Sequence, residues 1–135
     1  MSRFHTERVK AMRIVVVGPC ASGKTTLVNR LRELGLDAHN VAQEHSGIKA
    51  LWRKKSPDVV VMLDASLPVI RRRRSVPWGE ERLEAQRERL RDAREHASLF
   101  IQTDPLSREE VTERVLEYIA GRTDNGSTDC GRSEG

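Results

Sequence analysis

The sequence predicts a three-layer α/β/α fold built on a small, mainly parallel sheet of about four strands. Two observations support this prediction. Short apolar runs at 14–17, 59–63 and 99–101 alternate with longer segments that have helical spacing. These runs are apolar throughout, which is typical of strands covered on both faces of a parallel sheet. Right-handed connections would then place the carboxyl ends of the strands at one edge of the sheet.

The individual elements follow from helix start and stop signals as well as from apolar spacing. Gly35 is suited to end the first helix, and Pro68 to begin another. Ser107 and Glu110 form a capping box at the start of the last helix, which is expected to end at Gly121. The expected order is a strand over 14–17, a helix over 24–34, a weak strand over 36–42, a short amphipathic segment over 48–55, a strand over 59–63, helices over 68–74 and 80–97, a strand over 99–101 and a helix over 107–121.

A single domain is expected over residues 12–121, because 135 residues suffice for one hydrophobic core. Residues 1–11 are polar and lack an apolar pattern, and residues 122–135 are rich in glycine, serine and aspartate. Both segments are expected to be disordered by composition. Whether translation begins at Met1 or at Met12 stays open at this stage.

Composition argues against several classes of protein. The two cysteines, Cys20 and Cys130, do not make a disulfide framework, so a reduced, cytoplasmic setting is expected. No apolar run approaches the roughly 20 residues of a membrane helix, and the N-terminus lacks the apolar region of a secretory signal. The formal charge of +4 is mild, and only 4% of residues are aromatic. Stacking platforms for single-stranded nucleic acid are therefore scarce, and neither nucleic acid nor a membrane is expected as a partner. The oligomeric state is not predicted.

The segment VVVGPCASGKTT, residues 15–26, contains the most specific motif. Gly18–Thr25 matches G-x-x-x-x-G-K-[ST], the Walker A motif, between a strand-like run and an amphipathic helix. Glycines allow backbone N–H groups to approach phosphate oxygens, and the helix N-terminus adds partial positive charge. Lys24 is expected to reach the outer phosphates of ATP, and the Thr25 hydroxyl to bind Mg²⁺. The residues expected to hold the nucleotide share this loop: Gly18, Ala21, Ser22, Gly23, Lys24, Thr25 and Thr26.

Two acids follow strand ends and are candidates to assist the loop. Asp64 ends a buried-strand run and could hold Mg²⁺, although a turn or helix-capping role explains it equally well. Glu44 could accept the proton of an acceptor hydroxyl if it lies near the terminal phosphate; a solvated loop acid is the alternative. His45 is a weaker candidate for acid–base chemistry.

Four consecutive arginines, Arg71–Arg74, are candidates to neutralise phosphate charge. On a helix they point around the axis, so at most one or two can face a nucleotide. Arg72 is taken as the catalytic candidate, although the pattern does not distinguish among the four. A solvated helix face paired with the acids that follow is the alternative.

Three other residues are given no role in catalysis. Trp52 and Trp78 are expected to pack in the core or lid rather than to stack on a base. Cys20 lies in the phosphate loop, but the variable positions of this loop tolerate many residues, so no catalytic role follows.

With these motifs on hand, residues 12 to about 120 resemble a small P-loop kinase of the nucleoside, nucleotide and shikimate kinase type, within the P-loop NTPases. The pattern is also similar to that of short bacterial P-loop proteins of unassigned function. GPCASGKTTL resembles the phosphate loop of these kinases, and PDVVVMLDAS with PVIRRRR resembles the strand that leads into their lid. The lid-like segment would cover about 68–80. FIQTDPLSREEVTERVLEYI resembles their last strand and C-terminal helix.

The resemblance implies transfer of the γ-phosphoryl group of Mg-ATP to a nucleoside, nucleotide or similar small acceptor. The chain departs from the pattern in having one apolar strand ending in an acid where two are expected, and no acidic D-x-D after the second strand. Little sequence separates Glu44 from Asp64 to bind an acceptor. A nucleotide-binding or ATPase module that signals to a protein partner is therefore the alternative. The implied catalytic residues are Lys24, Glu44, Asp64 and Arg72, with Thr25 and Asp64 at the metal.

Overall fold

The computed structural model describes residues 12–74 and 77–124. Its centre is a four-stranded sheet with the strand order β2-β1-β3-β4, and every neighbouring pair is parallel. The predicted small parallel sheet is thus confirmed. The strands are β1 (Arg13–Val17), β2 (Asp37–Asn40), β3 (Val59–Asp64) and β4 (Leu99–Gln102).

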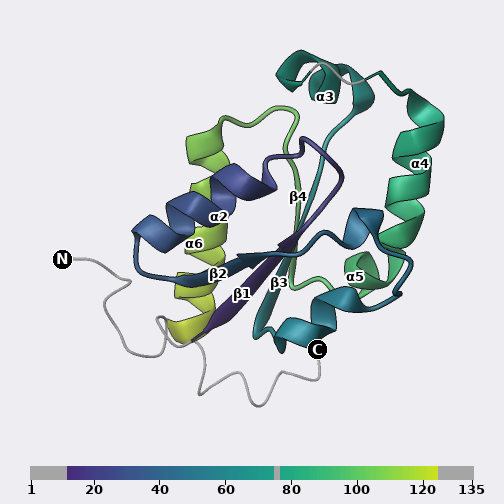
Figure 1. Ribbon diagram of the computed structural model, residues 1–135. Helices are drawn as coiled ribbons and strands as arrows, with labels where there is room; N and C mark the ends of the chain where they lie inside the picture. Colours follow the sequence, from purple (N-terminus) through teal and green to yellow (C-terminus); the bar gives the residue numbers. More distant parts are fainter. Residues whose placement is uncertain (1–11, 75–76, 125–135) are drawn as a thin grey trace.

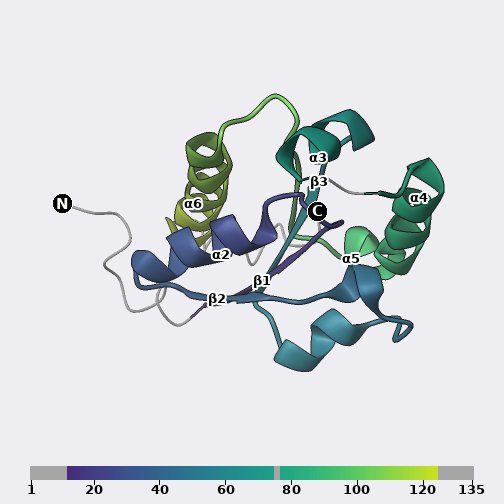
Figure 2. The same ribbon diagram turned by 45° about the horizontal axis from the view of Figure 1, so that its top comes forward.

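Helices cover both faces of the sheet and complete the expected three layers (Figures 1 and 2). On one face α2 and α6 lie side by side over a core that they share with the central strands. The other face is covered by Trp52, Leu90 and Ala93, from the segments around η2, α4 and α5. The helices are α2 (Lys24–Glu33), α3 (Leu67–Arg73), α4 (Glu80–Arg89), α5 (Arg91–Glu95) and α6 (Arg108–Asp124), with 3₁₀ turns η1 (Gln43–His45) and η2 (Leu51–Lys55).

The two central strands are buried along nearly their whole length. Successive side chains of β1 point to opposite faces, so Ile14 and Val16 join the core under α2 and α6 while Val15 and Val17 join the other core. β4 is an edge strand, and the prediction of a fully buried strand over 99–101 is wrong for it. Phe100 is 40% exposed, and the guanidinium of Arg94 lies 4.5 Å from the centre of its ring.

Several helix boundaries differ from those expected. The helix over 80–97 is two helices that meet at Leu90, and the segment over 48–55 forms a 3₁₀ turn. The last helix continues through Gly121 to Asp124, because Gly121 does not take the left-handed conformation that ends the first helix at Gly35.

Other local predictions are confirmed. Ser107 Oγ accepts a hydrogen bond from the Glu110 N–H, and the Ser107 N–H donates to Glu110 Oε1, so the capping box forms. Trp52 is buried and donates its indole N–H to Asp92, and Trp78 packs against the buried side chains of α3 and Leu83. Within the part of the chain described, no helix combines the length and apolar character needed to cross a membrane. Disorder was predicted for residues 1–11 and 122–135, but residues 122–124 form the end of helix α6. Residues 1–11 and 125–135 lie outside the described residues, as do residues 75–76 of the lid-like segment.

The order in which the chain adds strands to the sheet reverses between β1 and β3. β2 lies beside β1 on one side, and the chain then crosses to β3 on the other side of β1 and continues outward to β4. Such a reversal leaves a crevice beyond the carboxyl ends of the central strands, where ligands bind in open α/β sheets. The loop after Val17 starts in this position, and Asp64 lies opposite Gln102 at the same edge.

Candidate functional site

The loop between β1 and α2 folds closely against the end of β3. A Cβ atom on Gly18 would lie 2.6 Å from the Leu63 carbonyl oxygen, so only glycine fits there without a shift of the backbone. Ser22 Oγ donates a hydrogen bond of 2.7 Å to the Pro19 carbonyl. Ala21 and Gly23 have positive φ angles of 60° and 105°. The loop is therefore a compact backbone cradle that ends at the N-terminus of α2.

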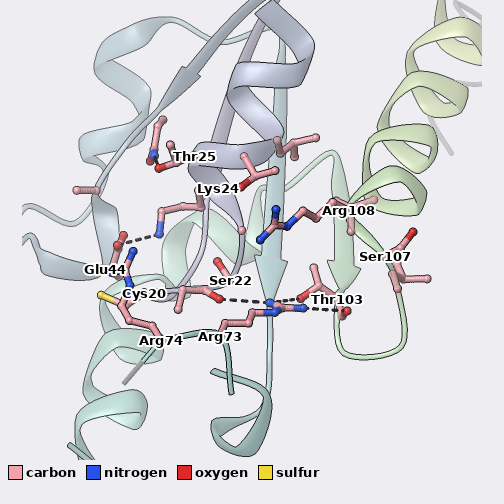
Figure 3. A pocket seen from close by; sticks show the side chains of 18 of the residues that line it. Cys20, Ser22, Lys24, Thr25, Glu44, Arg73, Arg74, Thr103, Ser107 and Arg108 are labelled. Carbon is pink, nitrogen blue, oxygen red and sulfur yellow. Dashed lines mark hydrogen bonds and ion pairs between the residues drawn. The ribbon is translucent and has the colours of Figure 1, made fainter. Parts of the chain in front are cut away.

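Lys24 does not extend into solvent but is held inside this cradle. Its ammonium group donates to the carbonyls of Gly18 (2.7 Å) and Pro19 (3.0 Å) and to Glu44 Oε2 (2.9 Å). Lys24 is 8% exposed and Glu44 3% exposed, so the ion pair is buried. The interpretation of Glu44 as a solvated loop acid is wrong. Figure 3 shows the pair at one side of a pocket.

Glu44 is placed by the 3₁₀ turn η1, which follows β2. Helix α4 packs on this turn, and Arg89 Nη1 donates to the Glu44 carbonyl oxygen (3.2 Å). The Gln43 side chain is fully buried and accepts a hydrogen bond from the Trp52 N–H. The turn is thus fixed on both sides, which keeps the Glu44 carboxylate directed at Lys24.

A cavity of about 410 Å³ lies beyond the loop, between the N-termini of α2 and α6 (Figure 3). Its volume is within the range of small-molecule pockets. Six of the seven residues expected to hold the nucleotide line it, and the seventh, Gly18, is buried beside Leu63. The six are Ala21, Ser22, Gly23, Lys24, Thr25 and Thr26.

Basic side chains form an arginine-rich wall of the cavity, and this wall contacts the loop. Arg73, Arg74 and Arg108 border the cavity, together with Thr103 and Ser107 (Figure 3). Burial lowers the pKa of Arg73; Asp104 opposes this shift, and the positive charges of Arg108 and Arg72 add to it. The positive charges of Arg73, Arg74 and Arg108 beside the cavity favour an anionic ligand.

Of the four consecutive arginines, the structure brings Arg73 and Arg74 to the cavity and leaves Arg72 away from it. Arg72 is exposed and does not line the pocket. Arg73 Nη1 donates to the Ala21 carbonyl and to Thr103 Oγ1, both at 3.2 Å, and so joins the loop to the end of β4. The buried side of α3 sets which arginine points inward.

Asp64 is also turned away from the cavity. Its Oδ1 accepts hydrogen bonds from the Ala65 N–H (2.9 Å) and from Arg87 Nη2 (3.2 Å), and Asp64 does not line the pocket. These contacts fit the turn interpretation of Asp64. A magnesium role for Asp64 stays a prediction, and it requires the Arg87 pair to open. Thr25, by contrast, lines the cavity, and its hydroxyl accepts a hydrogen bond from Asn40 (3.2 Å).

The structure brings Cys20, which the sequence analysis gave no catalytic role, against His45, its weaker candidate for acid–base chemistry. Cys20 Sγ lies 3.0 Å from His45 Nε2, and both residues line the cavity beside Glu44. The Cys20 N–H donates to Gln86 Oε1 on α4 (2.9 Å). No local spacing could reveal this contact, because it joins the loop after β1 to the turn after β2.

Comparison with known proteins gives partial similarities. The chain is similar to two curated proteins, each described as a "Nucleotide-binding protein", from Histophilus somni strains 2336 and 129Pt. Each is 32% identical over 105 residues, and the match covers 67% of this chain and 37% of the relative. The chain therefore spans little more than a third of the length of these relatives. No protein-family model matches the chain.

Proposed function

We propose that this chain binds Mg-ATP in the cavity beside the phosphate loop and transfers the γ-phosphoryl group to a small acceptor such as a nucleoside or nucleotide. The convergence of the Lys24 loop and an arginine wall on one cavity is the observation that carries this proposal. The description of the Histophilus somni relatives supports the nucleotide part.

The phosphates would occupy the backbone cradle at the N-terminus of α2. There the helix end favours negative charge, and the loop N–H groups can donate to phosphate oxygens. Lys24 would exchange its carbonyl and Glu44 contacts for the outer phosphates. Arg73 and Arg108, which also line the cavity, would neutralise the remaining charge.

The metal assignment rests on Thr25. Its hydroxyl is at the cavity and at the first turn of α2, so it fits a phosphate-bound Mg²⁺. When bound, Mg²⁺ would supply positive charge that offsets the charge of the phosphates. Asp64 would join only after releasing Arg87.

Glu44 is the proposed proton acceptor for phosphoryl transfer. Once Lys24 turns to the phosphates, the Glu44 carboxylate loses its cation while still facing the cavity. A carboxylate in that state can take the proton of an acceptor hydroxyl. We propose Arg73, which lines the cavity, in place of Arg72 as the residue that stabilises charge on the transferred group.

The test combines binding and transfer. Calorimetry should detect Mg-ATP binding to the full chain and its loss in Lys24→Ala. Labelled γ-phosphate should then move to one member of a panel of nucleosides, nucleotides and small alcohols, and Glu44→Gln should slow this transfer by about 100-fold or more. Failure of the wild-type chain to bind Mg-ATP would refute the whole proposal.

A nucleotide-binding module that signals to a protein partner is the second candidate. The size of the cavity favours it, because 410 Å³ is near the lower end of the range for a single drug-sized ligand. Little space then remains for an acceptor beside a nucleotide. Tight Mg-ATP binding with no transfer to any panel member would select this candidate over the kinase.

A further inference from the structure

Three side chains that commonly bind metals meet at the wall of the cavity. Cys20 comes from the loop after β1, and Glu44 and His45 come from η1 after β2. Cys20 Sγ is 3.0 Å from His45 Nε2, which is 3.6 Å from Glu44 Oε2. One ligand atom from each residue lies within 4.8 Å of the other two. Figure 3 shows the sulfur of Cys20 on the same side of the pocket as the Glu44 carboxylate.

An unpartnered atom at this cluster points to a missing ligand. Glu44 is 3% exposed, and its Oε1 is buried without a hydrogen-bond partner among the described residues. Lys24 contacts only the other oxygen, Oε2. A buried carboxylate oxygen without a partner is unfavourable, so the site gains free energy from any cation that can reach it.

We propose that Cys20, Glu44 and His45 form a binding site for a divalent transition metal of the Zn²⁺ class. A thiolate, an imidazole and a carboxylate are the donors that Zn²⁺ and Co²⁺ accept, whereas Mg²⁺ and Ca²⁺ take oxygen ligands. Zinc bond lengths of about 2.0–2.3 Å place tetrahedral ligands roughly 3.3–3.8 Å apart. The observed 3.0 and 3.6 Å are close to this range, and the separation between the thiol and the carboxylate is within 4.8 Å, so side-chain movements of about 1 Å suffice.

The cluster is positioned by the fold before any metal arrives. Gln86 accepts the Cys20 N–H, and Arg89 donates to the Glu44 carbonyl, so helix α4 holds both backbone segments. All three proposed ligands line the cavity, which leaves the fourth metal position open to a bound molecule. Three protein ligands with one open position are typical of reactive rather than purely structural zinc sites.

Metal binding and Lys24 compete for Glu44. The metal would release the Cys20 thiol proton to solvent and take the carboxylate that now pairs with Lys24. Lys24 would then be free for a ligand, while Glu44 could no longer accept a proton. This consequence for the nucleotide rests on the proposed function, whereas the metal site does not.

The direct test is Co²⁺ titration of the full chain carrying Cys130→Ser, so that Cys20 is its one thiol. We expect one equivalent of Co²⁺ to produce a thiolate-to-cobalt charge-transfer band in the near ultraviolet, which Zn²⁺ removes. The band should be absent in Cys20→Ser. Absence of the band in the parent, or its persistence in Cys20→Ser, would overturn the proposal.

Competition with a chromophoric chelator measures Zn²⁺ affinity. Cys20→Ser and His45→Ala should each weaken it by at least about 100-fold, since loss of mere outer-shell partners costs 10–100-fold. His39→Ala is the matched control and should stay within about twofold, because His39 contacts Asp37 away from the cluster. Circular dichroism would verify that each variant is folded. Equal weakening by the control would refute the assignment of ligands.

Lys24→Met tests the competition step. Removal of the ammonium group 2.9 Å from Glu44 should tighten Zn²⁺ binding by about tenfold. Unchanged or weaker binding would refute the competition. Mg-ATP binding measured with a zinc-selective chelator is independent of this result. A cobalt band without ATP binding would support the metal site and refute the proposed function. ATP binding without a cobalt band would support the proposed function and refute the metal site.

Discussion

Two acids at the same edge of the sheet have opposite surroundings. Glu44 pairs with Lys24 inside the phosphate loop, where the two side chains are 5% and 8% exposed, and both line the cavity. Asp64 pairs with Arg87 outside the cavity, where the Asp64 side chain is 10% exposed and the Arg87 side chain 30% exposed. A position just after a parallel strand therefore places an acid at the edge of the sheet where the carboxyl ends of the strands meet. It does not determine whether the side chain faces the cavity. In both cases a residue of α4 contacts the acid: Arg89 donates to the Glu44 carbonyl, and Arg87 pairs with the Asp64 carboxylate.

The difference in burial gives the two pairs different physical roles. Breaking a buried pair leaves an uncompensated charge and costs several kcal/mol, whereas a partly exposed pair contributes about 1 kcal/mol or less. The Lys24–Glu44 pair can be exchanged for a ligand, because its partners border an open cavity. The Asp64–Arg87 pair joins the end of β3 to α4, and neither of its residues lines that cavity.

The largest effect is expected when Lys24 is removed. Lys24→Ala leaves Glu44 buried without its cation, so the free energy of unfolding should fall by about 3 kcal/mol in urea titrations. Glu44→Gln combined with Lys24→Met is the matched control and should recover most of that loss, since it leaves no buried charge. A single variant as stable as the wild type would show that the pair is not buried in solution.

Glycine substitutions test how closely the loop is joined to the end of β3. Gly18→Ala places a methyl group 2.6 Å from the Leu63 carbonyl oxygen, so the backbone must shift and stability should fall by about 2–3 kcal/mol. Gly23→Ala has open space and bears only the strain of a positive φ of 105°, about 1 kcal/mol. Chemical denaturation of both variants should give this order. The reverse order would mean that the loop is not seated against β3.

Local sequence signals predicted much of the fold and the core of the site. The apolar runs located β1 and β3, and the glycine-rich motif located the cradle around Lys24, because each signal lies within a few adjacent residues. The capping box that begins α6 is equally local. The apolar run over 99–101 also predicted β4. A three-residue run does not reveal that this strand lies at the sheet edge, where Phe100 is exposed.

Contacts between distant segments could not be predicted. The burial of Glu44 depends on α4 packing over η1, and the Cys20–His45 contact depends on two loops meeting at the sheet edge. The choice of Arg73 over Arg72 depends on how α3 rotates to bury Ile70 and its neighbours, which a seven-residue helix does not reveal from its sequence.

The arginine wall gives a smaller expected effect than the loop. Arg73→Ala should weaken Mg-ATP binding by about tenfold, because a charged donor facing the cavity is lost. Arg72→Ala, on the same helix but not lining the cavity, is the matched control and should change the affinity by less than about twofold. Calorimetry on both variants measures the two affinities for Mg-ATP. A larger loss for Arg72→Ala would return the role to Arg72.

Asp64→Asn tests the pair that faces away from the cavity. It should lower stability by about 0.5–1 kcal/mol, with a similar loss for Arg87→Gln and little further loss in the double variant. The Mg²⁺ dependence of ATP binding should be unchanged. If Asp64→Asn abolished that dependence, Asp64 would be a metal ligand, and both acids would belong to the nucleotide site.

The smallest effect is expected at Asp37, where an exposed pair extends the comparison. Burial raises the pKa of Asp37, but hydrogen bonds from Arg13 and His39, with their charges, lower the pKa overall. A lowered pKa in the folded state stabilises the protein above the unfolded-state pKa, near pH 4, and this contribution is lost as the pH falls through the folded-state value. Because the Asp37 side chain is 39% exposed, solvent screening limits the contribution to a few tenths of a kcal/mol.

Urea titrations of wild type and Asp37→Asn at several pH values measure this contribution. The difference in unfolding free energy should be small at pH 7 and should shrink further on acidification below about pH 4. Arg30→Gln, which removes another exposed ion pair, with Glu109, provides a control for the general loss of a surface charge. A loss at Asp37 as large as that at Lys24 would show that burial does not separate these ion pairs, because the exposed pair would then contribute as much as the buried one.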